Sequence, residues 1–204
     1  MSSTLQMFIY PIVVVLAYLI GSLSAAIITC KIMGLPDPRT TGSNNPGATN
    51  VLRIGGKKAA IFTLIGDLLK GLIPVVIVKF AFPTEPLLIA LTALAAFLGH
   101  LFPVFFQFKG GKGVATALGC IIGLNLWVAL CALGVWLAIF LPTRISSLSA
   151  LTAAIVAPLF LWLFNASASV VIAIIIMDIL LIIRHKENIQ RILKGEEKKM
   201  TFKK

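Results

Sequence analysis

Residues 109–113 (KGGKG) combine two lysines with three glycines where a long apolar run ends and another begins. Glycines allow consecutive backbone N–H groups to point into one concavity, and such a nest binds anions. A helix that starts just after the nest would add donors and partial positive charge. We predict a phosphate site here, at a membrane surface; glycines that only permit close packing are the alternative. The candidate residues are Lys109, Gly110, Gly111, Lys112 and Gly113.

A second polar cluster covers residues 41–53 (TGSNNPGATNVLR) and is rich in uncharged hydrogen-bond donors. Arg53 ends this cluster, and its guanidinium can bind a phosphate through two parallel hydrogen bonds. The same residue types are common in turns, so an ordinary loop is the alternative. The candidate substrate-binding residues are Ser43, Asn45, Gly47, Thr49, Asn50 and Arg53.

Two further clusters lie in the second half of the chain. Arg144 precedes Ser146 and Ser147, and all three are candidate substrate-binding residues. The alternative is that the arginine only extends to the membrane surface and that a serine caps the next helix. His185 and Asn188 are three residues apart, so they are neighbours on one face if the last apolar helix continues into the tail. A histidine that is only polar surface is the alternative there.

Charged residues also occur within apolar runs, where they are costly and usually paired or functional. Asp67 and Lys70 are spaced for an i,i+3 ion pair, and the other possibility is that they contribute to the polar site. His100 lies near the end of its run and is expected to hydrogen-bond a neighbouring helix. No group of His, Cys and carboxylates has the spacing of a metal site, so we predict no metal.

The elements that must position these residues are long apolar helices. The 204-residue chain is 59% hydrophobic and only 12% charged, whereas soluble domains have about 25% charged residues. Several continuous apolar runs reach the length of about 20 residues that a membrane helix needs. We predict an all-α polytopic membrane protein with a single integral-membrane domain, residues 1–204. The expected spans are 8–30, 59–80, 87–106, two within 113–142 separated near residues 123–125, 148–164 and 169–183.

The basic residues set the expected topology. With a break at residues 123–125 there are seven spans, and every Lys and Arg except Lys70 and Lys79 lies on one side. The positive-inside rule then places the N-terminus outside and the C-terminus in the cytoplasm. This distribution explains the net charge of +11 without nucleic acid as a partner. The basic tail, about residues 184–204, is expected to be helix-permissive and to end in charges that are solvated or touch anionic lipid.

Four segments together resemble a known family: SNNPGATNVLR (43–53), DLLKGLIP (67–74), HLFPVFFQFKGGKGVAT (100–116) and RHKENIQRILKGEE (184–197). They are similar, in this order, to the PlsY-type bacterial acyl-phosphate:glycerol-3-phosphate acyltransferases, and the resemblance covers nearly the whole chain. It implies a multi-pass inner-membrane enzyme with its site on the cytoplasmic side and no cofactor. Such an enzyme transfers an acyl group from acyl-phosphate to the 1-hydroxyl of sn-glycerol 3-phosphate. The products are lysophosphatidic acid and phosphate, in the first step of phospholipid synthesis.

The resemblance also assigns expected roles and partners. The glycine loop with Lys112 would bind glycerol 3-phosphate, and Arg53 with the His185–Asn188 face would bind the other phosphate. Because acyl-phosphate is already activated, catalysis can depend on orientation and charge stabilisation. His185 or a substrate phosphate oxygen would be the base, and a Ser43 nucleophile is the least favoured option. Membrane lipid and the enzyme that supplies acyl-phosphate are further expected partners. A transporter of a phosphorylated metabolite, with Asp67, Lys70 and Asp178 along its path, is the alternative function.

Overall fold

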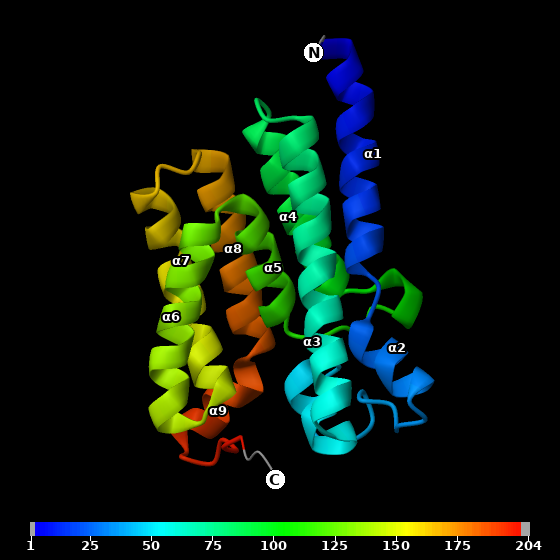
Figure 1. Ribbon diagram of the computed structural model, residues 1–204, viewed down its shortest axis with the longest axis vertical. Coiled ribbons are helices and arrows are strands. Elements are labelled where there is room, and N and C mark those ends of the chain that lie inside the picture. Colours follow the sequence, from blue (N-terminus) through cyan, green and yellow to red (C-terminus); the bar gives the residue numbers. More distant parts are fainter. Residues whose placement is uncertain (1–2, 201–204) are drawn as a thin grey trace. The chain divides into compact units, whose positions relative to one another are not determined.

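The computed structural model describes residues 3–200, and every regular element in that range is a helix (Figure 1). The predicted all-α class is therefore confirmed for the described part of the chain. The chain divides into two compact units, Met1–Leu124 and Asn125–Lys204, which are described separately below. The elements are α1 (Ser3–Gly21), α2 (Ala25–Ile32), α3 (Ala48–Ala81), α4 (Pro86–Leu101), the short 3-10 helix η1 (Val104–Phe106), α5 (Val114–Leu124), α6 (Leu126–Thr143), α7 (Ser146–Leu163), α8 (Ala168–Arg184) and α9 (Lys186–Leu193).

In the first unit, α3 packs against α1, α2, α4 and α5, and α1 packs against α4. Small residues allow the backbones to approach closely, as is typical of membrane helices. A Cβ on Gly119 of α5 would collide with the Leu68 carbonyl of α3, and one on Gly71 would collide with the Thr116 carbonyl. The α3–α5 contact therefore requires glycine on both helices.

The long helix α3 differs from the expectation. The second span was predicted to begin at residue 59, with a polar loop before it, but the chain becomes helical at Ala48 and bends at Gly56. Gly56 has φ 76° and ψ −173°, a backbone conformation accessible almost only to glycine. The segment before the bend carries Arg53 on a rigid helical turn rather than on a loop.

The first predicted span, residues 8–30, is also broken. Helices α1 and α2 are bent by 40° at the three residues between them. Ser24 caps α2, because its hydroxyl accepts a hydrogen bond from the Ile27 N–H at 3.5 Å. A local capping interaction thus interrupts a run that is continuously apolar in sequence.

The break predicted at residues 123–125 is confirmed. Helix α5 ends at Leu124, and the Asn125 side chain caps α6 by accepting from the N–H groups of Trp127 and Val128 at 2.9 and 3.3 Å. Helix α5 has 11 residues, so it is about 16 Å long at the standard rise. That is about half the thickness of the hydrocarbon core.

In the second unit, α7 packs against α6, α8 and α9, and α8 also contacts α9. The condition under which His185 and Asn188 would share one face, a tail that continues the last apolar helix, is not met. Helix α8 ends at Arg184, and α9 leaves it at an angle of 61° with His185 at the junction. The tail helix therefore follows its own direction from His185 onward.

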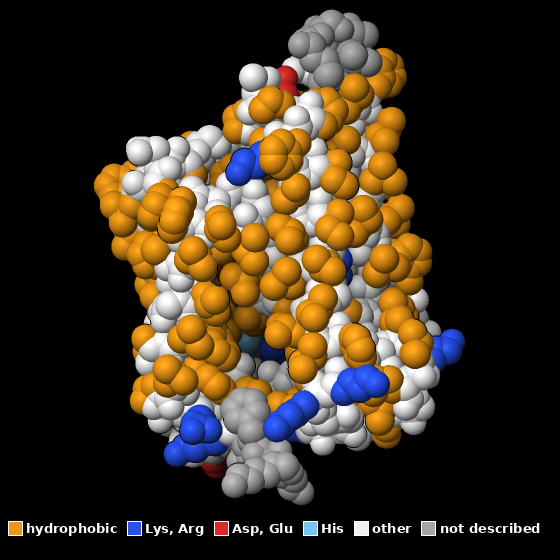
Figure 2. All heavy atoms as spheres, viewed as in Figure 1, with side chains coloured by type: hydrophobic (Ala, Val, Ile, Leu, Met, Phe, Trp, Pro, Cys, Tyr) orange, Lys and Arg blue, Asp and Glu red, His pale blue; other side chains and the backbone are white. Residues whose placement is uncertain are grey.

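Four helical segments among the described residues are long and apolar enough to cross a membrane, or up to six if each bent pair counts as one span. In the first unit, hydrophobic side chains cover the flanks of α1 and α3, while Lys and Arg gather mostly around the end where α3 begins (Figure 2). Seven spans would require α5 as a crossing, and this count stays a prediction.

Candidate functional site

The first polar loop is held in shape by Asn50. This side chain is 1% exposed; its Oδ1 accepts from the Ser43 N–H at 2.9 Å, and its Nδ2 donates to the carbonyls of Pro38 and Thr41 at 3.0 and 2.9 Å. Asn50 thus shapes the loop that presents the exposed Ser43, and its predicted contact with substrate stays a prediction. Gly47, another predicted site residue, is the N-cap of α3, and its carbonyl accepts from the Asn50 and Val51 N–H groups.

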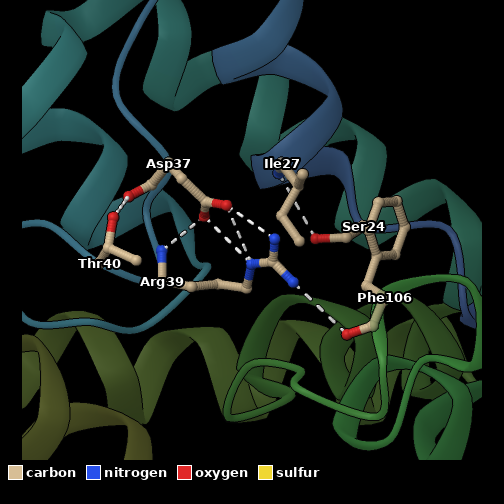
Figure 3. A network of polar contacts seen from close by, with 6 residues as sticks. All are labelled: Ser24, Ile27, Asp37, Arg39, Thr40 and Phe106. Atoms are coloured by element: carbon tan, nitrogen blue, oxygen red, sulfur yellow. Dashed lines mark hydrogen bonds and ion pairs between the residues drawn. The ribbon is translucent and has the colours of Figure 1, made fainter.

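Arg39 ties the same loop to the segment that follows α4 (Figure 3). Its guanidinium pairs with Asp37 at 2.7 Å and donates to the Phe106 carbonyl at 3.5 Å. Hydrogen bonds from Arg39 hold the pKa of the Asp37 carboxyl below its ordinary value. This anchor was not predicted as part of the site, although an Asp and an Arg two residues apart in a polar loop are a recognisable signal.

The glycine loop lies directly on the end of α4. The Gly111 N–H donates to the His100 carbonyl at 3.2 Å. A Cβ on Gly111 would collide with the His100 ring and lie 3.1 Å from the Pro46 carbonyl, and a Cβ on Gly110 would meet the backbone of His100. The glycines are thus needed for close packing, and they bring the glycine loop next to the first polar loop.

The end of the glycine loop leads into α5. Gly113 has φ 88°, in the left-handed region, and its carbonyl accepts from the Ala117 N–H at 2.7 Å in the first turn of α5. Lys112 is half-buried and Lys109 is exposed. The loop therefore has the predicted position before a helix N-terminus, and anion binding there stays a prediction.

A buried network of charged and polar groups lies beneath the glycine loop. The Asp67 carboxylate is 2.8 Å from the Lys70 ammonium, which confirms the predicted i,i+3 pair. His100 Nδ1 lies 3.6 Å from the same carboxylate and 3.1 Å from the Thr116 hydroxyl. Lys70 also donates to the Leu23 carbonyl at 2.8 Å. Because His100 contacts both this network and Gly111, the network supports the glycine loop from below.

In the second unit, His185 is 3% exposed and its Nδ1 lies 2.8 Å from the Leu181 carbonyl. A carbonyl oxygen only accepts hydrogen bonds, so Nδ1 carries a proton. In the neutral imidazole, Nε2 is then the basic nitrogen. A role for His185 as a general base stays a prediction.

Three side chains of the second unit converge on Glu197. Its carboxylate accepts from the Ser147 hydroxyl at 2.7 Å, the Asn188 amide at 2.5 Å and the Arg191 guanidinium at 2.6 Å. The Glu197 side chain is only 8% exposed, so the expectation of solvated tail charges is wrong at this residue. Burial acts to raise the pKa of Glu197, but the three hydrogen bonds outweigh it and hold the pKa below its ordinary value.

Arg144 lies at the turn between α6 and α7. It caps α6 with φ 60°, and its carbonyl accepts from the Met200 N–H at 2.8 Å, while its side chain is exposed. The alternative of a serine helix cap is wrong, because Ile145 is the N-cap of α7 and makes no side-chain cap bond. Ser147 faces Glu197 and Ser146 is half-buried.

The structure thus brings the predicted clusters together in pairs. In the first unit the polar loop and the glycine loop meet at Pro46 and Gly111, and in the second unit the tail joins the α6–α7 turn to Asn188. The predicted site residues of the first unit are Ser43, Asn45, Gly47, Thr49, Asn50, Arg53, Asp67, Lys70, His100, Lys109, Gly110, Gly111, Lys112 and Gly113. Those of the second unit are Arg144, Ser146, Ser147, His185 and Asn188.

These features define a helical membrane protein whose polar clusters suit an anionic substrate. Comparison with known proteins is more specific. The family described as glycerol-3-phosphate acyltransferase matches residues 11–195, and the chain belongs to this family. The resemblance noted in the sequence is confirmed.

Named relatives and solved structures agree with this membership. The glycerol-3-phosphate acyltransferase of Methylococcus capsulatus is 57% identical over 187 residues, covering 92% of this chain and 94% of the relative. That of Thioalkalivibrio sulfidiphilus is also 57% identical, covering 92% of each. The crystal structure of PlsY, an integral membrane glycerol 3-phosphate acyltransferase, in its glycerol 3-phosphate form has a TM-score of 0.90 and 44% identity, covering 94% of this chain and 96% of that chain. Its lysophosphatidic acid form has a TM-score of 0.88 and 42% identity, covering 95% and 96%.

Proposed function

We propose that this protein transfers an acyl group from acyl-phosphate to the 1-hydroxyl of sn-glycerol 3-phosphate, the first step of phospholipid synthesis. The observation that carries the proposal is its similarity, over nearly its full length, to a PlsY whose two crystal forms are named for glycerol 3-phosphate and lysophosphatidic acid. These two compounds are the acceptor and the product of the proposed reaction. The acyl-phosphate donor is inferred from the PlsY-type sequence motifs.

The reaction needs no covalent enzyme intermediate. The 1-hydroxyl oxygen attacks the acyl carbon, the bond from that carbon to the phosphate oxygen breaks, and phosphate leaves with the bonding electrons. The hydroxyl proton passes to a base. His185 is the proposed base, since its Nδ1 contact with Leu181 makes Nε2 the basic nitrogen. A phosphate oxygen of a substrate is the other base that the chemistry allows.

The first unit supplies the charged donors that we assign to the two phosphates. In the first unit we assign glycerol 3-phosphate binding to the glycine loop, with Lys112 as the charged donor and the α5 N-terminus adding partial positive charge. Arg53 is the proposed charged donor to acyl-phosphate, and Asn50 holds the loop that carries the neighbouring polar groups. Further proposed binding residues are Ser43, Asn45, Gly47, Thr49, Lys109, Arg144, Ser146, Ser147 and Asn188.

We further propose a single integral-membrane domain with seven crossings, in the inner membrane of a bacterium. Its N-terminus would lie outside, and the polar clusters and C-terminus would face the cytoplasm, as the positions of the basic residues favour. The expected partners are membrane lipid and the enzyme that supplies acyl-phosphate.

The intramembrane pair Asp67 and Lys70 gives the transporter alternative no support. Asp67 and Lys70 pair with each other, and their side chains are 3% and 6% exposed. Both side chains are thus buried as well as paired in the described structure. Their contacts with His100 and Leu23 favour a supporting role.

The deciding experiment mixes the purified full-length protein with acyl-phosphate and labelled glycerol 3-phosphate in detergent. We expect labelled lysophosphatidic acid and an equal amount of free phosphate. Replacing acyl-phosphate by acyl-CoA tests the donor, and no product is expected then. Absence of product with acyl-phosphate, while label accumulates inside proteoliposomes, would reject the enzyme and favour transport.

A further inference from the structure

Glu197, in the C-terminal tail, makes more polar contacts than a surface glutamate normally does. Its three partners come from two helices of the second unit: Ser147 from the start of α7, and Asn188 and Arg191 from α9. The neighbouring Glu196 is exposed and accounts for none of these contacts. Of the two adjacent glutamates, only Glu197 therefore makes these three contacts.

Local chain geometry brings Glu197 to this position. Helix α9 ends at Leu193, and Gly195 follows with φ 71° in the left-handed region. The Glu196 N–H donates to the Arg191 carbonyl at 2.8 Å and the Gly195 N–H to the Ile192 carbonyl at 3.0 Å, the paired bonds of a Schellman motif. This motif reverses the chain, so that the next residue points back over α9.

The tail is anchored again beyond Glu197. The Met200 N–H donates to the Arg144 carbonyl at 2.8 Å, next to the start of α7. The carboxylate is thus held between a capped helix end and a backbone hydrogen bond. A segment built in this way is a fixed part of the second unit.

We propose that Glu197 is a positioning residue, whose carboxylate sets the orientation of the Ser147 hydroxyl and the Asn188 amide toward the substrates. This inference rests on the proposed function, which takes Ser147 and Asn188 as substrate-facing groups. One carboxylate oxygen, Oε1, accepts from both residues, so their side chains are fixed relative to each other. The other oxygen accepts from Arg191, which holds the carboxylate in place.

A competing idea is that the carboxylate imitates a substrate phosphate and blocks the site. The two ideas predict opposite changes in rate. Removing a positioning group lowers turnover and weakens substrate binding, because the reacting groups lose their orientation. Removing a blocking group raises activity.

The test compares Glu197→Gln and Glu197→Ala with the matched controls Glu196→Gln and Glu196→Ala, all as purified full-length protein. We expect kcat/KM to fall about 10-fold in Glu197→Gln, which keeps one amide oxygen as acceptor, and up to about 100-fold in Glu197→Ala. The KM for at least one of the two substrates should rise. The Glu196 variants should match the unsubstituted protein.

A second measurement separates positioning from a purely structural role. The thermal midpoint and the gel-filtration profile report whether each variant is folded, and a structural role alone would change these while leaving KM unchanged. If Glu197→Ala fails to fold, the Glu197→Gln and Glu196→Gln pair carries the comparison. Equal KM and kcat in that pair, or increased activity in a Glu197 variant, would overturn the inference. If the unsubstituted protein makes no lysophosphatidic acid, both the proposed function and this inference are rejected.

Discussion

His185 is the proposed general base, and the Leu181 carbonyl, 2.8 Å from its Nδ1, holds the proton on that nitrogen. We expect His185→Gln to lower kcat by about 10²- to 10⁴-fold, the usual contribution of a general base, with little change in KM. Steady-state kinetics with acyl-phosphate would measure this. A variant with near-normal turnover would assign proton abstraction to a substrate phosphate instead.

Lys112 is the half-buried cation of the glycine loop. We expect Lys112→Ala to reduce kcat/KM for glycerol 3-phosphate by about 10- to 100-fold or more, since a charged hydrogen bond contributes about 1.5–3 kcal/mol. Lys58→Ala is the control, because Lys58 is exposed and outside the proposed site. Full activity of a folded Lys112→Ala protein would remove the phosphate-nest hypothesis.

The lowered pKa of Glu197 predicts that the folded tail loses stability as the pH falls. Its pKa in the folded protein lies below the ordinary value, so its stabilising contribution is present above that ordinary value and is lost as the pH falls through the lowered one. We expect hydrogen-exchange protection of the tail amides, corrected for the intrinsic rate, to decrease below a pH of about 4. Glu197→Gln should remove this dependence, and the same acid response in that variant would contradict the assignment.

At the scale of elements, α3 and the end of α4 carry the buried charges that support the glycine loop. Asp67→Leu would leave the buried Lys70 ammonium without its carboxylate, which costs about 3–5 kcal/mol. The double variant Asp67→Leu/Lys70→Leu removes both charges and should lose less stability than the single variant. Thermal unfolding in detergent measures the difference, and equal losses would show that the pair is not the source of the effect.

Helix boundaries were predictable only where the signal is local. The break before α6 follows from the Gly123-Leu124-Asn125 sequence, and Asn125 is a cap that accepts two backbone hydrogen bonds. The bend at His185 has no such local signal, because the residues on both sides of it favour helix and neither Gly nor Pro interrupts them. The helical segment before Gly56 was missed for a related reason, since its Asn, Thr and Gly residues are common in turns.

For the whole molecule, the number of crossings determines whether the termini lie on the same side. Seven crossings, with α5 as one of them, place the termini on opposite sides, whereas six place them on the same side. We expect a C-terminal tag to be protected from protease in intact spheroplasts and an N-terminal tag to be cleaved. Protection of both tags would indicate an even number of crossings and reject the proposed topology.

The sequence by itself determined the all-α class, the membrane character, the break at Asn125 and the pairing of Asp67 with Lys70. These features depend on composition, capping and i,i+3 spacing, which are local. The tertiary structure alone decided that His100 joins Asp67, that Gly111 lies beside Pro46, and that Glu197 binds Ser147 across 50 residues of sequence. Such contacts depend on how the helices pack and on the backbone reversal at Gly195. Neither hydropathy nor charge spacing in the sequence shows which residues will contact one another.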